Sequence, residues 1–168
     1  MTVNVLSSDA VYITMTGRSV WALLNAYYAV LRETEYRPTQ IIILSETEHA
    51  GQISKVKKGL AILSEGYRIA PDVDVEQIPT GDFIDAGRKI STRIRKVQQE
   101  GGKVAIDITP GRKALVAGAL IPLASISVDH VFYLQITSTD DAAKPYMMIP
   151  RSSQQLRDFR ATSPQVLP

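Results

Sequence analysis

The sequence contains no cysteine and only two histidines, His49 and His130. The lack of cysteine excludes a disulfide framework, a thiol nucleophile, a cysteine-ligated zinc site and an iron–sulfur cluster. A serine–histidine triad or a multi-histidine metal site would have to use one of the two histidines. We expect His49 on a helix surface and His130 in a loop, so the sequence predicts neither a metal site nor a cofactor.

Long hydrophobic runs are also missing. The longest apolar stretch, residues 114–126, is interrupted by Gly118 and Pro122 and is too short to span a bilayer. The N-terminus has no basic stretch followed by an apolar core, which is the pattern of a secretion signal. We therefore expect a cytoplasmic protein.

The sequence also lacks a large excess of either charge, because it has 19 basic and 17 acidic residues. This balance argues against general coating of nucleic acid. One predicted helix does carry a basic face, and we expect it to be a solvated surface, with nucleic-acid contact as the alternative. Its residues are Arg88, Lys89, Arg93, Arg95 and Lys96.

The common nucleotide-binding and hydrolase motifs are absent. There is no G-x-x-x-x-G-K-[ST] loop and no G-x-G-x-x-G after the first predicted strand. Residues 17–21 nearly match the G-x-S-x-G elbow of hydrolases, but Trp21 occupies the place of the last glycine.

Hydrophobic patterning predicts alternating strands and helices over most of the 168 residues. Helices are expected from residues 20, 53 and 83 onward and over 114–125. The predicted strands cover residues 10–15, 41–44, 73–78, 103–108 and 131–136, and 144–149 is expected to pair with the last as a hairpin. The order predicts an α/β fold with a Rossmann-like open, mostly parallel six-stranded sheet, helices on both faces and a C-terminal β-hairpin. We assign residues 1–150 to one domain and residues 151–168 to a tail or linker. In one interpretation, this tail is where the chain was truncated before an effector domain.

Ligands of such sheets bind where the strand order reverses, here between the first and fourth strands. The two loops at that point, residues 14–19 and 107–113, each lead into a helix N-terminus, which favours an anion. Both carry cations instead of the usual acidic residues: Arg18 in one, Arg112 and Lys113 in the other. These cations indicate a phosphate site, or they extend into water.

Polar side chains of the first loop and of the second strand's end are further candidates for ligand contacts. Thr14, Thr16 and Ser19 bring hydroxyls to ribose or phosphate oxygens, unless Thr16 or Ser19 caps the helix. A second group, Ser45, Glu46 and Thr47, faces the same rim, or caps the following helix.

The loop after the fourth strand offers Asp107, Pro110 and Gly111. Asp107 is suited to orient a hydroxyl or to hold Arg112, or else it caps the turn at Thr109. Pro110-Gly111 fits a type II turn in which glycine takes a positive φ, bringing backbone N–H groups close to a ligand.

Residues 107–113, Asp-Ile-Thr-Pro-Gly-Arg-Lys, resemble the signature turn of CRISPR-associated Rossmann fold (CARF) domains. Residues 14–19 loosely match the other motif of that family, and the resemblance spans residues 5–150. It implies a homodimer that binds a cyclic oligoadenylate, most often the four-membered ring (cA4), across its two-fold axis. The implied ligand contacts are Thr16, Gly17, Arg18, Ser19, Thr109, Gly111, Arg112 and Lys113.

Most such domains are sensors that switch an attached effector of type III CRISPR antiviral defence. Some are metal-independent ring nucleases, in which Lys113 would stabilise developing charge and Ser19 would orient the attacking 2′-hydroxyl. The sequence leaves sensor, ring nuclease and nucleic-acid-binding regulator open as alternatives.

Overall fold

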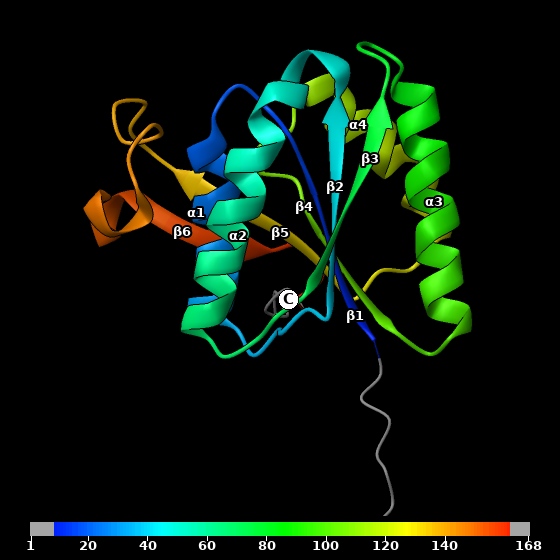
Figure 1. Cartoon of the computed structure of the whole chain (residues 1–168), viewed down its shortest axis with the longest axis horizontal. Helices are drawn as coiled ribbons and strands as arrows, with labels where there is room; N and C mark the ends of the chain where they lie inside the picture. The colour runs from blue at the N-terminus through cyan, green and yellow to red at the C-terminus, as the bar shows by residue number, and fades with distance from the viewer. Residues whose placement is uncertain (1–8, 162–168) are drawn as a thin grey trace, which may run out of the picture.

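The computed structural model describes residues 9–161, which form one α/β layer structure (Figure 1). Its strands are β1 (Ala10–Met15), β2 (Gln40–Glu46), β3 (Asp72–Ile78), β4 (Lys103–Asp107), β5 (His130–Ile136) and β6 (Gln154–Asp158). Its α-helices are α1 (Val20–Glu33), α2 (Ile53–Gly66), α3 (Phe83–Gln99) and α4 (Lys113–Leu120). Short 3-10 helices are η1 (Thr47–Gln52), η2 (Ile121–Ser125), η3 (Tyr146–Met148) and η4 (Arg151–Ser153).

The six strands form one sheet in the order β3-β2-β1-β4-β5-β6. All neighbours pair in parallel except β5 and β6, which are antiparallel. Strand order reverses between β1 and β4, so the predicted switch point is confirmed. In a parallel sheet the loops that leave these two strands emerge at the same edge.

Helices cover both faces of the sheet, as Figure 1 shows, with α1 and α2 on one side and α3 and α4 on the other. The central strands β1 and β2 are almost completely buried, which explains their continuous apolar sequences. Alternate residues of β1 serve different cores: Tyr12 packs with α1, while Ile13 packs with α3 and α4. The sheet thereby holds the β1 and β4 loops between two packed layers.

The hairpin strand expected over residues 144–149 is wrong. Those residues form η3 and its approach, and β6 pairs with β5 instead. Residues 151–153 therefore form η4 and residues 154–158 the edge of the sheet, rather than a weakly structured tail. Pro145 and Pro150 lack the N–H that a strand needs. Asn25 of α1 also holds this connection, accepting from the Tyr146 N–H and donating to the Lys144 carbonyl, both at 2.8 Å. Residues 162–168 of the predicted tail lie outside the described residues.

Two smaller expectations also change. The helix predicted over 114–125 ends at Leu120 and continues as η2, because Pro122 cannot donate the next helical hydrogen bond. His130 starts β5 rather than lying in a loop, and its Nδ1 is 2.8 Å from the Asp158 carboxylate. Within residues 9–161, no helix is long and apolar enough to cross a membrane.

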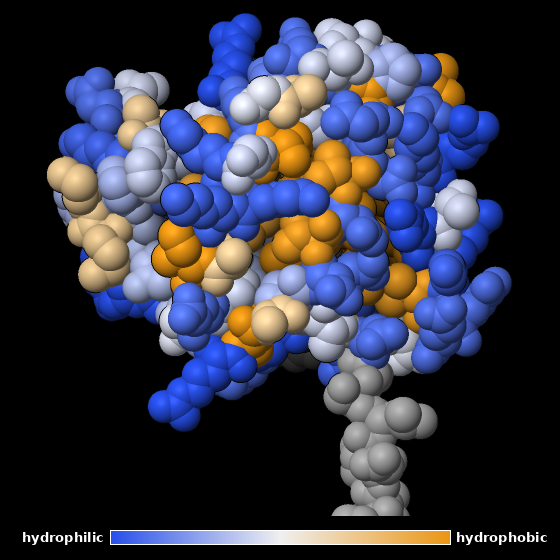
Figure 2. Space-filling view, in the orientation of Figure 1, coloured by the Kyte–Doolittle hydropathy of each residue, from blue (hydrophilic) through white to orange (hydrophobic). Residues whose placement is uncertain are grey.

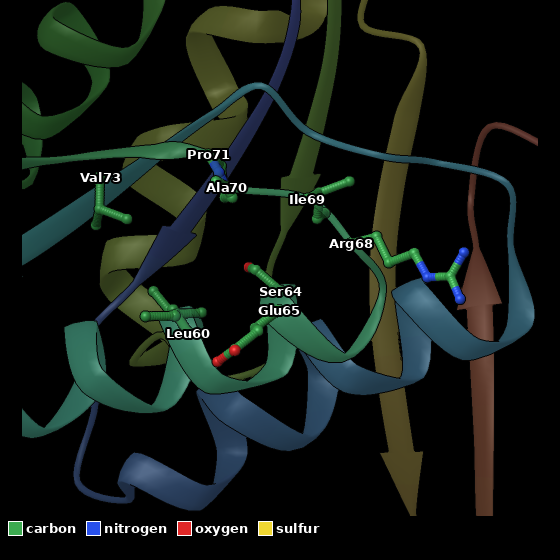
Figure 3. Close-up of a pocket in the computed structure, with 9 residues that line it drawn as sticks. Leu60, Ser64, Glu65, Arg68, Ile69, Ala70, Pro71 and Val73 are labelled. Atoms are coloured by element: carbon green, nitrogen blue, oxygen red, sulfur yellow. The ribbon is translucent and has the colours of Figure 1, made fainter.

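Figure 2 shows hydrophobic side chains gathered over the edge strand β3, between α2 and α3. A hollow of about 420 Å³ lies at the end of α2 and the beginning of β3, lined by Leu60, Arg68 and Val73 among others (Figure 3). It opens where strands begin, whereas the predicted site lies where strands end. We therefore do not assign the ligand to this hollow.

Candidate functional site

The loops that follow β1 and β4 contact each other through Gly17 and Pro110. A side chain at position 17 would overlap the Pro110 carbonyl, so only glycine lets the two loops approach this closely. Gly111 is similarly confined, since an added Cβ would lie 2.7 Å from the Met15 sulfur. Gly111 is not among the glycines with positive φ, so the expected type II turn is wrong, and close packing explains this glycine instead.

Replacing Gly17 with alanine should force the two loops apart. We expect a loss of about 2 kcal/mol in the free energy of unfolding, because overpacking against backbone is relieved only by moving the chain. Urea denaturation measures this effect. The matched control is Gly51→Ala in η1, where an added Cβ meets nothing within 4 Å. Equal stability of the two variants would contradict the contact.

Beneath the loops, Asp107 is fully buried and accepts two hydrogen bonds. The Thr14 hydroxyl donates to one carboxylate oxygen and the Thr109 N–H to the other, each at 2.9 Å. Burial raises the pKa of Asp107 to about 6, although these hydrogen bonds work in the opposite direction. Asp107 therefore caps the turn at Thr109, as one of its three expected roles required. Its other oxygen is bound by the protein's own Thr14 hydroxyl, so the role of orienting a ligand hydroxyl stays a prediction.

The third expected role, holding Arg112, belongs to Glu46. This carboxylate at the end of β2 has no exposed surface, and the Arg112 guanidinium binds both of its oxygens, with Nε 3.0 Å from Oε2. The Gly81 N–H also donates to Glu46. Burial alone would raise the pKa of Glu46, but the hydrogen bonds from Arg112 and Gly81 outweigh it and lower that pKa.

Glu46 thus joins three loops. Arg112 comes from the β4–α4 loop, Gly81 from the β3–α3 loop, and Glu46 itself precedes η1. The β3–α3 loop was not among the predicted site residues. The parallel sheet is the signal that would have found it, because β3 ends at the same edge as β1 and β4.

Two helix N-termini open onto this rim without side-chain caps. Neither α1 nor α4 has a capping hydrogen bond or an acidic residue in its first turn, whereas Asp82 caps α3. Ser19 occupies the N-cap position of α1, yet its hydroxyl makes no cap. The exposed cations beside these termini are Arg18 and Lys113. Free N–H groups, helix dipoles and cations together favour a polyanion.

A cluster of Glu46, Glu48 and His49 places ligand atoms within 4.8 Å of one another, close enough to hold one metal ion. The Arg112 guanidinium already contacts both carboxylates, 3.3 Å from that of Glu48. A cation would have to displace this arginine. His49 lies largely buried in η1, so its expected place on a helix surface is wrong.

The structure brings the predicted site residues to one edge of the sheet but buries half of them. The residues with little or no exposed surface are Thr14, Thr16, Gly17, Ser45, Glu46, Asp107 and Pro110. Ser45 and Glu46 belong to β2 rather than to a loop. The residues that solvent reaches are Arg18, Ser19, Thr47, Thr109, Gly111, Arg112 and Lys113. The buried set supports the loops, and the accessible set is where a ligand can make contact.

No protein-family model and no curated protein matches this sequence. Several solved structures do match the fold of this chain. Can2 from Sulfobacillus thermosulfidooxidans in complex with cyclic tetra-adenylate aligns over 79% of this chain and 33% of its own, with 10% identity and a TM-score of 0.57. Csm6 from Enterococcus italicus, bound to cyclic hexa-2′-fluoro-hexa-dAMP, aligns over 92% of this chain and 42% of its own, with 9% identity and a TM-score of 0.56.

Protein VC1899 from Vibrio cholerae aligns over 74% of this chain and 30% of its own, with 14% identity and a TM-score of 0.57. This chain therefore spans less than half the length of each of the three. At these identities the likeness concerns the fold. The Rossmann-like fold predicted from the order of strands and helices is confirmed: residues 9–161 share the fold of the aligned parts of these three proteins.

Proposed function

We propose that this chain binds a cyclic oligoadenylate, with cA4 the preferred ring, as the sensory module of a type III CRISPR antiviral effector. The observation that carries the proposal is the rim itself: two uncapped helix N-termini with exposed Arg18 and Lys113 at the switch point of the sheet. The ligands present in the Can2 and Csm6 structures support the choice of a cyclic adenylate.

A two-fold homodimer suits this ligand. Cyclic tetra-adenylate repeats the same phosphate and base on opposite sides, so two identical rims can each bind half of it. Each protomer would contribute Arg18, Lys113 and the free N–H groups of α1 and α4. The ion pair between the buried Glu46 and Arg112 would hold the β4–α4 loop in position for this contact.

Calorimetry with purified protein and cA4 tests the proposal. We expect saturable binding of one ring per two chains, with linear tetra-adenylate binding more weakly because it is not preorganised. Sedimentation in the same buffer gives the oligomeric state. Failure to bind either cA4 or the six-membered ring would overturn the assignment.

The ring-nuclease alternative rests on Ser19, whose hydroxyl makes no capping hydrogen bond and is free to orient a ribose 2′-hydroxyl. In that reaction the 2′-oxygen attacks the adjacent phosphorus, the bond to the 5′-oxygen breaks, and that oxygen takes up a proton. The product is a linear adenylate with a 2′,3′-cyclic phosphate. Lys113 would stabilise the developing charge. Chromatography of cA4 over time distinguishes cleavage from binding, and cleavage that survives Lys113→Ala would contradict this role.

The alternative of a nucleic-acid-binding regulator depends on the basic face of α3, and ion pairs on that face weaken it. Arg88 and Lys89 pair with Asp85, and Arg93 pairs with Glu76. Exposed charges that already have acidic partners attract phosphates less strongly.

A further inference from the structure

An apolar groove runs along the outer surface of α1 and α2. It comprises two adjoining hollows of about 480 and 260 Å³, which share Trp21, Leu24, Gly59 and Ile62. Pro145 and the first two residues of η3, Tyr146 and Met147, close one end. Gly59 allows the two helices to approach closely, since an added Cβ would lie 2.7 Å from the Leu24 side chain. We call these residues the α1–α2 groove.

Large apolar side chains stand exposed around the α1–α2 groove. Trp21 is 41% exposed, Ile62 59% and Met147 69%. Single exposed apolar residues are common on protein surfaces, but a cluster around one hollow marks an interaction site. These three come from separate elements and border the same hollow, so the exposure belongs to one surface.

Among the described residues, the charged side chains that line the groove are both basic. Lys55 and Lys58 line it at the end where α1 begins, and neither has an ion-pair partner among residues 9–161. At the other end the Arg32 guanidinium contacts the Met147 sulfur at 3.4 Å. Among the described residues that line the two hollows, none is acidic.

We propose that the α1–α2 groove docks an acidic amphipathic helix of a partner protein. A groove between two helices accepts a third helix through residues one turn apart. On α1 the lining positions Trp21, Leu24 and Tyr28 follow that spacing and extend over roughly 10 Å, which two to three turns of a partner helix would cover. Carboxylates flanking its apolar face would meet Lys55 and Lys58.

Two other occupants fit the groove less well. A second copy would offer Lys55 and Lys58 only the same groove, in which no described lining residue is acidic and whose other end carries Arg32, so no charge complementarity would favour that contact. A nucleotide needs polar groups that recognise its edges, and the only amide in the groove, that of Asn25, is already bonded to the Lys144 carbonyl and the Tyr146 N–H. The remaining walls are largely aliphatic or aromatic.

This inference is independent of the ring-binding proposal, and the ligand-free protein tests it. Trp21 is the only tryptophan in the chain and lines the groove, so in the ligand-free protein no second tryptophan contributes to its signal. The probe is a synthetic peptide of about 16 residues, long enough for four helical turns. It carries leucine at helical spacing and glutamates on either side, and contains no aromatic residue. A second peptide, its basic twin, has the same sequence with lysine in place of every glutamate.

We expect the acidic peptide to shift Trp21 emission to shorter wavelength, saturably, and to bind at least about tenfold tighter than its basic twin. Lys55→Glu with Lys58→Glu should reverse that preference. The matched control is Lys57→Glu with Lys96→Glu, which makes the same charge change at exposed lysines outside the groove and should leave the preference intact. Circular dichroism establishes that both double variants are folded.

Equal affinity for the two peptides would overturn the proposal, because it would leave only non-specific apolar adhesion. So would the absence of any shift with the acidic peptide. A shift that depends on protein concentration alone would assign the groove to a second copy. Quenching by linear oligoadenylate, stronger than the effect of the peptide, would assign it to nucleic acid.

Discussion

Exchanging Arg18 and Lys113 together for alanine is expected to weaken binding of cA4 by roughly 100- to 1000-fold, about 3–4 kcal/mol. In the proposed complex each cation would donate charge-assisted hydrogen bonds to phosphate at an uncapped helix N-terminus, and both contributions would be lost. These two residues serve the test better than Arg112 does. Arg112 neutralises the buried Glu46, so its removal would destabilise the loop as well as the ligand contact.

The same double replacement should not lower the stability of the protein, although it weakens binding. A cation at a helix N-terminus opposes the helix dipole, so its removal should leave the free energy of unfolding unchanged or a few tenths of a kcal/mol higher. Calorimetry measures the affinity and urea denaturation the stability. The matched control is Arg95→Ala with Lys96→Ala, two exposed cations on α3, and it should bind cA4 normally. Undiminished binding by the Arg18 and Lys113 variant would place the ligand elsewhere.

The second large effect concerns Asp107 and pH. Burial raises the pKa of this carboxyl to about 6 in the folded protein, above its value in the unfolded chain. The folded state therefore holds the proton more tightly. The resulting stabilisation is fully present below about pH 4 and is lost as pH rises through about 6. We expect the loss to be on the order of 3 kcal/mol, measured against Asp107→Asn, which has no such titration.

Urea denaturation at several pH values between 4 and 7 measures this difference. Asparagine can still accept from the Thr109 N–H, so Asp107→Asn should remain folded; Asp107→Ala leaves buried donors without an acceptor and should be less stable at every pH. Asp158 supplies a control of opposite sign. Burial works to raise its pKa, but hydrogen bonds, chiefly from His130, lower it overall. Relative to Asp158→Asn, the native protein should gain stability as pH rises through the acid range. Parallel curves for native protein and Asp107→Asn would refute the titration.

The sequence predicted the elements whose patterns depend on burial. Residues 10–13 and 41–44 are continuous apolar runs because both faces of β1 and β2 are covered, and the alternation of strands and helices implied the switch point. The last strand was misplaced for the same reason. Gln154–Asp158 is a partly exposed edge strand in which Leu156 alone is apolar, so it has no alternating pattern to detect.

The site was predicted in outline but not in its internal arrangement. Parallel topology brings Thr14 and Asp107 to one edge, and both were expected there. The pairing of Glu46 with Arg112 depends on how far β2 extends and on the course of two loops, which no local pattern specifies. The groove at Trp21 and Ile62 was missed because an exposed apolar residue has the same sequence signature as a buried one.

Asn25 connects α1 to the segment between β5 and β6. Its amide clamps the Lys144–Tyr146 backbone to α1, the helix whose first turn follows the rim at Ser19. The Tyr146 hydroxyl adds a second attachment by donating to Glu33 at 2.6 Å. Displacing α1 along its axis would therefore pull the β5–β6 connection with it. These contacts join the helix that begins beside the rim to a segment more than a hundred positions away in sequence.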